Sequence, residues 1–590
     1  MRIDSVMDNV ARISSFDRYQ ASLGLGQAAA VVAGEAARAG LDEVAVTHFP
    51  ADGKPQWWTF RAPVSWTPLT ARCTVFAGAG GTGPAVAHTD HAQQPFALAA
   101  YSAATPAGGA VAPLVRIRGD EAIGSRLAGT VAVVDRSAFL RGSLIPELTA
   151  AGALGLLTDA PCNTADGEPK PGRIELPMDS ALFAFSVTPA MFGAAASAAD
   201  GGGSVRAEIA VDRTAAMPVV SGVLPGDDTD DEIWLTAHLC HPRPGSNDNA
   251  SGVAALLGVA DALSRVRRAD SAYGTRRPVR FFWGAEFLGN AAVLHSRSQP
   301  GGGRLPAALI NLDMVGEDQA LCRSPFVVER PPETSPTLLA PLAEHVVEQV
   351  FAATGDSPGT WSPSPFLGFS DHALYADPSV DRPAVQFCHP DDRFNHSAAD
   401  SPDKVSPVEM ARATTAGAAL ALLLANDGPG PDALGRIVDG WCAGEEEAAA
   451  RVARRRGDAW GQGLHGHVLR WNEELRSLAA GAPPGGQGLP AAAGVPSGGR
   501  PVERRWDGPL NLRAMLGELP PATRARLASM IAADKHQLSV LFNLAIRADG
   551  RRDRRAVCAD TSYALRRPLE AAGTERLFDA LLESGWLAEV

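Results

Sequence analysis

The stretch Leu235–Gly252, L-T-A-H-L-C-H-P-R-P-G-S-N-D-N-A-S-G, constrains the fold more than any other part of the chain. It begins within an apolar segment, 233–237, that is typical of a buried strand, and apolar residues recur at helical spacing after it ends. His238 and Asp248 lie between, and both are side chains of the kinds that bind zinc. Because open α/β sheets place their sites at the carboxyl ends of strands, this stretch predicts a functional site at that edge.

Composition and charge narrow the class of protein. A chain of 590 residues is long enough for two to four domains, and its net charge of −13 gives no general attraction to nucleic acid or to an anionic membrane. The seven cysteines are odd in number and form no C-x-x-C pair, which favours free thiols in a reducing compartment. The N-terminus shows no apolar signal segment, and we expect a cytoplasmic protein without a membrane partner. The oligomeric state is open, and a homo-oligomer is one alternative.

Residues 216–427 alternate between strand and helix patterns, which predicts an α/β fold with a mainly parallel sheet and helices on both faces. The expected strands are Val219–Leu224, Glu232–Ala237, Val279–Trp283, Ala308–Leu312 and Ala384–Phe387. The expected helices are Gly252–Arg267, Asn290–Ser298, Thr337–Thr354 and Ser406–Ala425.

Polar side chains recur where these strands end. Glu286 follows V-R-F-F-W-G-A, and Asp313 follows A-L-I-N-L. Asp371 lies in G-F-S-D-H, and His396 lies in R-F-N-H-S. Together with the histidine and aspartate above, these imidazoles and carboxylates occupy equivalent positions at one predicted sheet edge, which indicates a shared site.

The motifs T-A-H, S-N-D-N-A-S-G, G-A-E, N-L-D-M-V-G, F-S-D-H and N-H-S-A-A-D-S-P-D-K-V occur in this order. In this order they resemble the motifs of co-catalytic zinc aminopeptidases, metallopeptidase family twenty-eight, over residues 216–427. More narrowly, H-L-C-H-P and the flanking segments look like a bacterial aminopeptidase-like group. The resemblance implies a zinc exopeptidase fold, a metallopeptidase hydrolase, and a cofactor of one or two zinc ions.

The resemblance also implies roles for individual residues. His238, Asp313 and His396 match zinc ligands, and Asp248 matches the carboxylate that bridges two ions. Glu286 matches the general base beside the metal-bound water, which would take a proton and return it to the leaving amine.

Two departures from the family pattern leave alternatives open. Cys240 stands where the family has an aspartate, with His241 next, and either could be an alternative ligand or a residue that orients the ligands. The family's second glutamate is absent, so Glu286 is either the base or a ligand, and a single-zinc site is an alternative to two zincs. Asp371 is expected to lie behind the ligands, and His389 is expected to face substrate or to be structural.

The flanking segments predict further domains. Residues 1–60 are expected to complete the peptidase domain. Residues 61–215 resemble a protease-associated domain inserted into it, through G-T-V-A-V-V-D-R at 129–136 and G-A-L-G-L-L at 152–157. The H-T-D-H run at 88–91 looks metal-like, but a structural or surface role is preferred.

The C-terminal third predicts a helical segment and flexible linker at 428–507, followed by a winged-helix-like module at 508–590. The linker itself is expected at 479–500, which is rich in Gly, Pro and Ala. The basic stretch 547–556 would either contact phosphates or form a solvated turn, and the acidic chain favours the turn, so a nucleic-acid partner is not expected.

The sequence therefore predicts a zinc-dependent aminopeptidase that hydrolyses the N-terminal bond of a short peptide or peptide-like metabolite. One alternative is an acyltransferase of the glutaminyl-cyclase kind. Another is a degenerate peptidase fold that senses a ligand and binds nucleic acid through its tail.

Overall fold

An eight-stranded mixed sheet forms the centre of the computed structural model, which describes residues 2–227, 231–270, 274–355, 359–483 and 498–590. Its middle strands are parallel, and antiparallel neighbours occur toward both edges. The strands in order across the sheet are β1 (Asp42–Phe49), β11 (Met217–Leu224), β13 (Val279–Gly284), β12 (Ile233–His238), β14 (Ala308–Leu312), β17 (Ala384–Cys388), β15 (Phe326–Glu329) and β16 (Trp361–Ser364).

Alternate residues of the central strands face different helix layers, as the period of two in a strand requires. On one face, Trp234 packs edge-on against Tyr375 of α10 (His372–Ala376). On the other face, the indole nitrogen of Trp283 donates to Val253 O at the start of α6 (Gly252–Ala269). The sheet is therefore buried on both sides, which explains the unbroken apolar runs of its strands.

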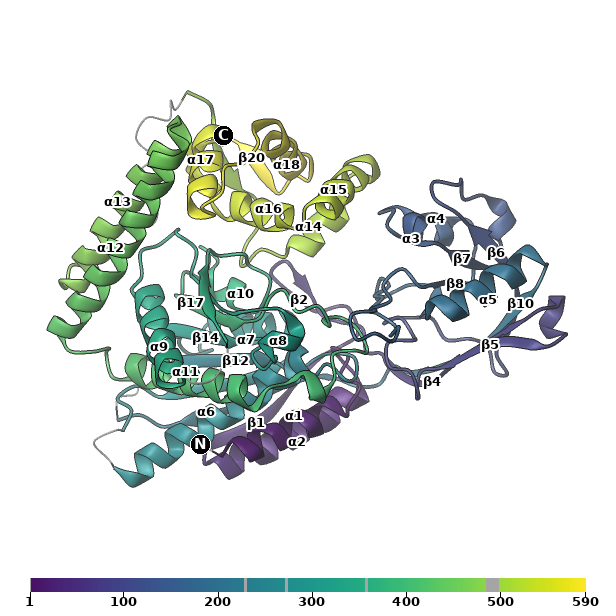
Figure 1. The fold of residues 1–590 in the computed structure, drawn as a ribbon, viewed down its shortest axis with the longest axis horizontal. Coiled ribbons are helices and arrows are strands. Elements are labelled where there is room, and N and C mark those ends of the chain that lie inside the picture. The colour runs from purple at the N-terminus through teal and green to yellow at the C-terminus, as the bar shows by residue number, and fades with distance from the viewer. Residues whose placement is uncertain (1, 228–230, 271–273, 356–358, 484–497) are drawn as a thin grey trace.

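The helices on the α6 side form one packed layer beneath the sheet (Figure 1). The N-terminal helices belong to this layer, so the first residues of the chain pack against the central sheet domain. One helix, α11, is long and apolar enough to cross a bilayer, but it lies against α6 and α9 and is largely buried. The remaining members of the layer are α1 (Ile3–Ser14), α2 (Leu23–Ala39), α9 (Leu339–Ala353) and α11 (Pro407–Ala425).

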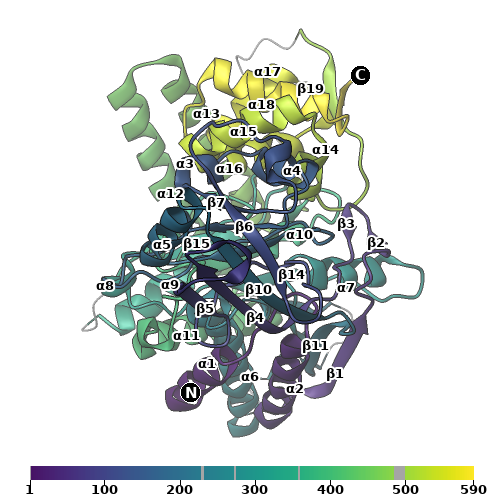
Figure 2. The ribbon, with the colours of Figure 1, turned by 90° about the vertical axis from the view of Figure 1, so that its right-hand side faces the viewer.

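A second sheet with its own apolar core forms a lobe beside the first (Figures 1 and 2). Its helices are α3 (Arg136–Phe139), α4 (Leu144–Ala150) and α5 (Pro189–Asp200). The strands in order are β5 (Ala85–Asp90), β4 (Thr67–Phe76), β10 (Ser204–Asp212), β6 (Ala110–Ile117), β7 (Val131–Val134), β8 (Gly155–Thr158) and β9 (Phe183–Ser186). The H-T-D-H side chains are dispersed here: His88 lies near Thr74, Asp90 pairs with Arg72, and His91 pairs with Asp17.

A helical hairpin, α12 (Pro431–Arg456) and α13 (Ala459–Ala479), leads to a C-terminal module. The module has a three-stranded antiparallel sheet, and buried Asp377 of the peptidase domain accepts hydrogen bonds from Arg504 and from Leu510 N. The module's elements are β18 (Pro501–Arg504), α14 (Leu512–Glu518), α15 (Pro521–Ala533), α16 (His536–Ile546), β19 (Asp549–Asp553), α17 (Arg554–Ala564), α18 (Ala571–Glu583) and β20 (Leu587–Glu589).

The basic stretch of this module is mostly engaged within the protein. Arg547 is buried, Arg552 pairs with Asp549 and Asp560, and Arg554 pairs with Asp579. Its charges are therefore not gathered on one face, and Arg551 and Arg555 are its exposed arginines.

The α/β fold class is confirmed. One boundary differs from the expectation: the sheet of the C-terminal module includes β18, which begins at Pro501, before the predicted residue 508. Most of the linker expected at 479–500 lies outside the described residues. The protease-associated and winged-helix assignments stay predictions.

Arg18 holds the segment that follows β12 in place. Its fully buried guanidinium donates to the carbonyl oxygens of Leu239, Ile13 and Gly245, and its backbone exchanges two hydrogen bonds with His241. Burial lowers the pKa of Arg18 to about 10, so it stays charged at neutral pH.

Replacing Arg18 by Met should lower the free energy of unfolding by about 2 to 3 kcal/mol, because several buried carbonyl oxygens lose their donor. Denaturant unfolding followed by circular dichroism measures this. Arg12→Met, which removes an exposed pair with Glu35, is the control and should cost about 1 kcal/mol or less. Equal losses in the two variants would contradict the anchoring role of Arg18.

Candidate metal centre

Asp248 is fixed in the turn between β12 and α6 by a second aspartate. The carboxylate of Asp400 accepts hydrogen bonds from the backbone nitrogens of Asn247, at 2.7 Å, and Asp248, at 3.0 Å. Burial raises the pKa of Asp400 to about 8, although these two donors oppose the shift. The side chain of Asp248 is nearly buried, and its two oxygens face in different directions.

The first group of side chains lies on the side of Asp248 Oδ1. His238, at the end of β12, places its Nε2 3.2 Å from Asp248 Oδ1 and 3.1 Å from Asp313 Oδ1. Glu286 completes this group, because its carboxylate and the ligand atoms of His238 and Asp313 all lie within 4.8 Å of one another. Burial alone would lower the pKa of His238, but Asp313 and Asp248 raise it well above its usual value. The group thus concentrates carboxylates that need a nearby positive charge.

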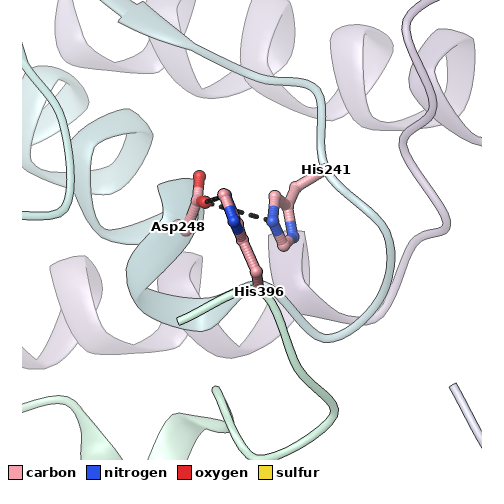
Figure 3. A group of neighbouring side chains, drawn as sticks. All are labelled: His241, Asp248 and His396. Carbon is pink, nitrogen blue, oxygen red and sulfur yellow. Dashed lines mark ion pairs between the residues drawn. The ribbon is translucent and has the colours of Figure 1, made fainter. Parts of the chain in front are cut away.

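The second group lies on the side of Asp248 Oδ2 (Figure 3). Nε2 of His241 is 3.1 Å from this oxygen, and Nε2 of His396 is 3.3 Å from it. The two imidazoles are nearly parallel, with ring centres 5.9 Å apart. Burial lowers the pKa of His241 to about 4, so its imidazole is neutral at pH 7, which is the form that binds metal.

Both groups fit a metal ion. Ligand atoms about 2.1 Å from a shared tetrahedral ion are about 3.4 Å apart, close to the separations around both oxygens of Asp248. Nδ1 of His238 lies 3.0 Å from Cys240 O, and Nδ1 of His241 lies 2.9 Å from Pro242 O. When Nδ1 donates to these carbonyls, Nε2 is left with a free lone pair. Nε2 of His241 is buried and makes no hydrogen bond, as expected of a ligand atom.

Cys240 and Asp371 hold the backbone around Glu286. Its amide donates to Cys240 Sγ at 3.1 Å, and the next amide, of Phe287, donates to Asp371 Oδ1 at 2.6 Å. Burial raises the pKa of Glu286, and repulsion from Asp313 and Asp248 adds to this shift. Burial, with repulsion from Glu286, raises the pKa of Asp371 to about 7. Cys240 therefore orients Glu286, and its sulfur belongs to neither group of candidate ligands.

His389 lies apart from both groups. It is fully buried, with Nδ1 3.1 Å from Ser324 O and 3.2 Å from Glu317 Oε2. This placement is structural. The sequence left His241 as either an alternative ligand or a residue that orients the ligands, and the structure aims it at Asp248. The available signal was the second imidazole just beyond the end of the strand, in H-L-C-H-P.

The inserted lobe contributes a cation to this site. Arg173 N donates to His396 O at 2.7 Å, and its Nη1 lies 3.2 Å from His396 Nε2. Its Nη2 donates to Glu175 at 2.6 Å, and Arg513 of the C-terminal module lies 4.0 Å from the same carboxylate. Three parts of the chain therefore meet at the exposed side of His396.

Comparison with known proteins identifies the central part of the chain. The model of peptidase family M28 matches residues 219–421, which include both groups of candidate ligands. Residues 219–421 belong to peptidase family M28. No curated protein sequence matches the chain.

Two solved structures share the fold of this chain. The zinc aminopeptidase BSAP from Bacillus subtilis is 16% identical, with a TM-score of 0.50, over 71% of this chain and 94% of that one. A peptidase M28 precursor from Shewanella amazonensis is also 16% identical, with a TM-score of 0.50, over 72% and 93%. The predicted family and the predicted class, a metallopeptidase hydrolase, are confirmed, and the predicted zinc agrees with the metal in the Bacillus structure's name.

Replacing His241 by Ala should reduce bound zinc from about two ions to about one per chain, because one of the two groups loses a ligand. Elemental analysis of the purified protein measures this without reference to activity. His88→Ala, which alters an exposed histidine of the inserted lobe, should leave the zinc content unchanged.

The variant Cys240→Ser should retain about two zincs, as His88→Ala does, since the sulfur of Cys240 contacts the amide of Glu286. Unchanged zinc in His241→Ala, or a loss in Cys240→Ser equal to that of a ligand, would contradict this assignment.

Proposed function

We propose that the protein is a zinc-dependent aminopeptidase with two metal ions, which removes the N-terminal residue of short peptides or peptide-like metabolites. The observation that carries this proposal is the placement of Asp248, whose two oxygens each face a separate group of imidazole and carboxylate ligands. His238, Asp248 and Asp313 would hold one ion, and His241, Asp248 and His396 would hold the other. The name of the Bacillus relative supports the aminopeptidase assignment.

The placement of His241 supports the base role for Glu286 over the ligand role. The family's second glutamate is missing from this chain, but the second group already has three candidate ligands without a glutamate. Glu286 is therefore free to act as the base, and burial raises its pKa, which makes its carboxylate a better proton acceptor.

Bound zinc would supply an acidified water and would polarise the scissile carbonyl. Glu286 then accepts the proton of the attacking water at a carboxylate oxygen and delivers it to the departing amine. Asp371 and Cys240 keep the backbone of Glu286 fixed during both transfers. Arg173, beside His396, places a guanidinium where negative charge would develop on the substrate.

The inserted lobe supports a preference for short substrates. Arg173 approaches the candidate ligands from this lobe, and the backbone of Gly172 pairs with Ser397 next to His396. Asn163 of the same lobe donates to Arg393 O. The lobe thus lies directly beside His396, which supports a preference for short substrates over folded proteins.

Purified protein should contain about two zincs per chain and should hydrolyse aminoacyl chromogenic amides and dipeptides. Removing zinc with a chelator should abolish hydrolysis, and adding zinc back should restore it. A chain with no zinc and no turnover after zinc is added would contradict the proposal and favour a ligand-sensing role.

Glu286→Gln should lower kcat by about 100-fold or more while the zinc content stays at about two, because the proton acceptor is lost and no ligand is removed. Steady-state kinetics and elemental analysis on one preparation measure both quantities. A drop in zinc would instead make Glu286 a ligand. Glu232→Gln, which changes a carboxylate paired with Arg280 on the far end of β12, is the control and should keep full turnover.

A further inference from the structure

A cavity of about 320 Å³ lies where the peptidase domain, the α12–α13 hairpin and the C-terminal module meet. Most of its wall is apolar, and it includes Phe366, Trp441, Trp471 and Leu464. None of the candidate zinc ligands lines it. Its volume is at the lower end of the range for small-molecule sites, so it would admit a compact ligand.

Arg547 of α16 is the unusual member of this wall. Its side chain is 2% exposed, and its only hydrogen-bond partners within the described part of the chain belong to Asn543, at 2.6 Å and 3.2 Å. Its Nη2 is buried and makes no hydrogen bond. Burial and the charge of Arg552 lower the pKa of Arg547 to about 10, although the more distant carboxylates of Asp560 and Glu333 oppose the shift, and Arg547 stays charged at neutral pH.

The other two arginines of the wall are paired with carboxylates. Arg330 contacts Glu344 and Glu445, and Arg566 contacts Glu333. No such ion pair reaches Arg547 among the residues that the structure describes. A buried guanidinium without a carboxylate is costly, and in natural proteins such a charge is usually compensated by a partner.

The charges of the wall limit what the partner can be. Three arginines (330, 547 and 566) and two glutamates (333 and 445) line the cavity, and Glu344 behind the wall also pairs with Arg330. Among the described residues, the guanidinium of Arg547 is the one of the three without an ion pair, and its single positive charge is what a partner would neutralise. A monoanion neutralises this charge, whereas a dianionic phosphate would exceed it beside two glutamates. A planar carboxylate can also accept two parallel hydrogen bonds from one guanidinium.

We propose that this cavity binds a small monocarboxylate with an apolar body, whose carboxylate pairs with Arg547 and whose apolar part lies against Phe366 and the two tryptophans. The site is separate from the metal centre, and its occupation does not require the proposed peptidase activity.

The test uses the full-length protein with phenylacetate and 4-methylpentanoate as probes, their neutral amides as matched controls, and inorganic phosphate as a third arm. Titration calorimetry should detect binding of at least one of the two carboxylates, with its amide at least about tenfold weaker, the loss expected for a charge-assisted hydrogen bond. Each carboxylate that binds the native state should also raise the midpoint of thermal unfolding.

Arg547→Gln should weaken carboxylate binding at least about tenfold, whereas Arg551→Gln, which alters an exposed arginine of the same module, should leave it unchanged. Ala449→Leu is a second test of the site, because it fills part of the cavity and keeps the guanidinium of Arg547. It should also abolish binding. Circular dichroism of each variant verifies that it is folded.

Three results would overturn the proposal: no binding of either carboxylate to the wild type, equal binding to Arg547→Gln and Arg551→Gln, or tighter binding of phosphate than of both carboxylates. Loss of zinc or of peptidase activity would bear on the metal centre alone, so failure of one proposal is distinguishable from failure of the other.

Discussion

The shared carboxylate of Asp248 is the constraint on which the metal centre depends. Its two oxygens can serve two groups only while the turn before α6 stays in place, and Asp400 secures this turn through two backbone hydrogen bonds. Several buried carboxylates therefore lie within a small volume, and burial first, with repulsion from neighbouring carboxylates second, raises the pKa values of Glu286, Asp371 and Asp400. Such crowding is sustainable where cations compensate the charge.

Much of this arrangement can be predicted from the sequence because it depends on local order. The apolar strands, and the polar residues directly after them, place His238, Glu286 and Asp313 at one edge, since parallel strands end together. The helix after Asp248 follows from its apolar periodicity. Family motifs add the roles, which spacing alone does not define.

The remaining features depend on contacts between distant segments. His241 becomes a candidate ligand only because Arg18 ties the backbone after β12 to the N-terminal helices. Arg173 reaches His396 from another lobe. The lack of an ion pair at Arg547 follows from the way the C-terminal module packs against the rest of the described chain. Sequence periodicity carries no information about such pairs, because each is decided by packing rather than by local propensity.

The short segment from Phe366 to Asp371 joins the cavity at the C-terminal module to the candidate metal centre. At one end, Asn543 of the C-terminal module donates to Phe366 O beside the cavity. At the other end, Asp371 holds the amide that follows Glu286. Glu329 secures the middle of the segment through Leu367 N and Gly368 N. Hydrogen bonds thus link the C-terminal module to the backbone beside Glu286, so the surroundings of this side chain include residues beyond 219–421.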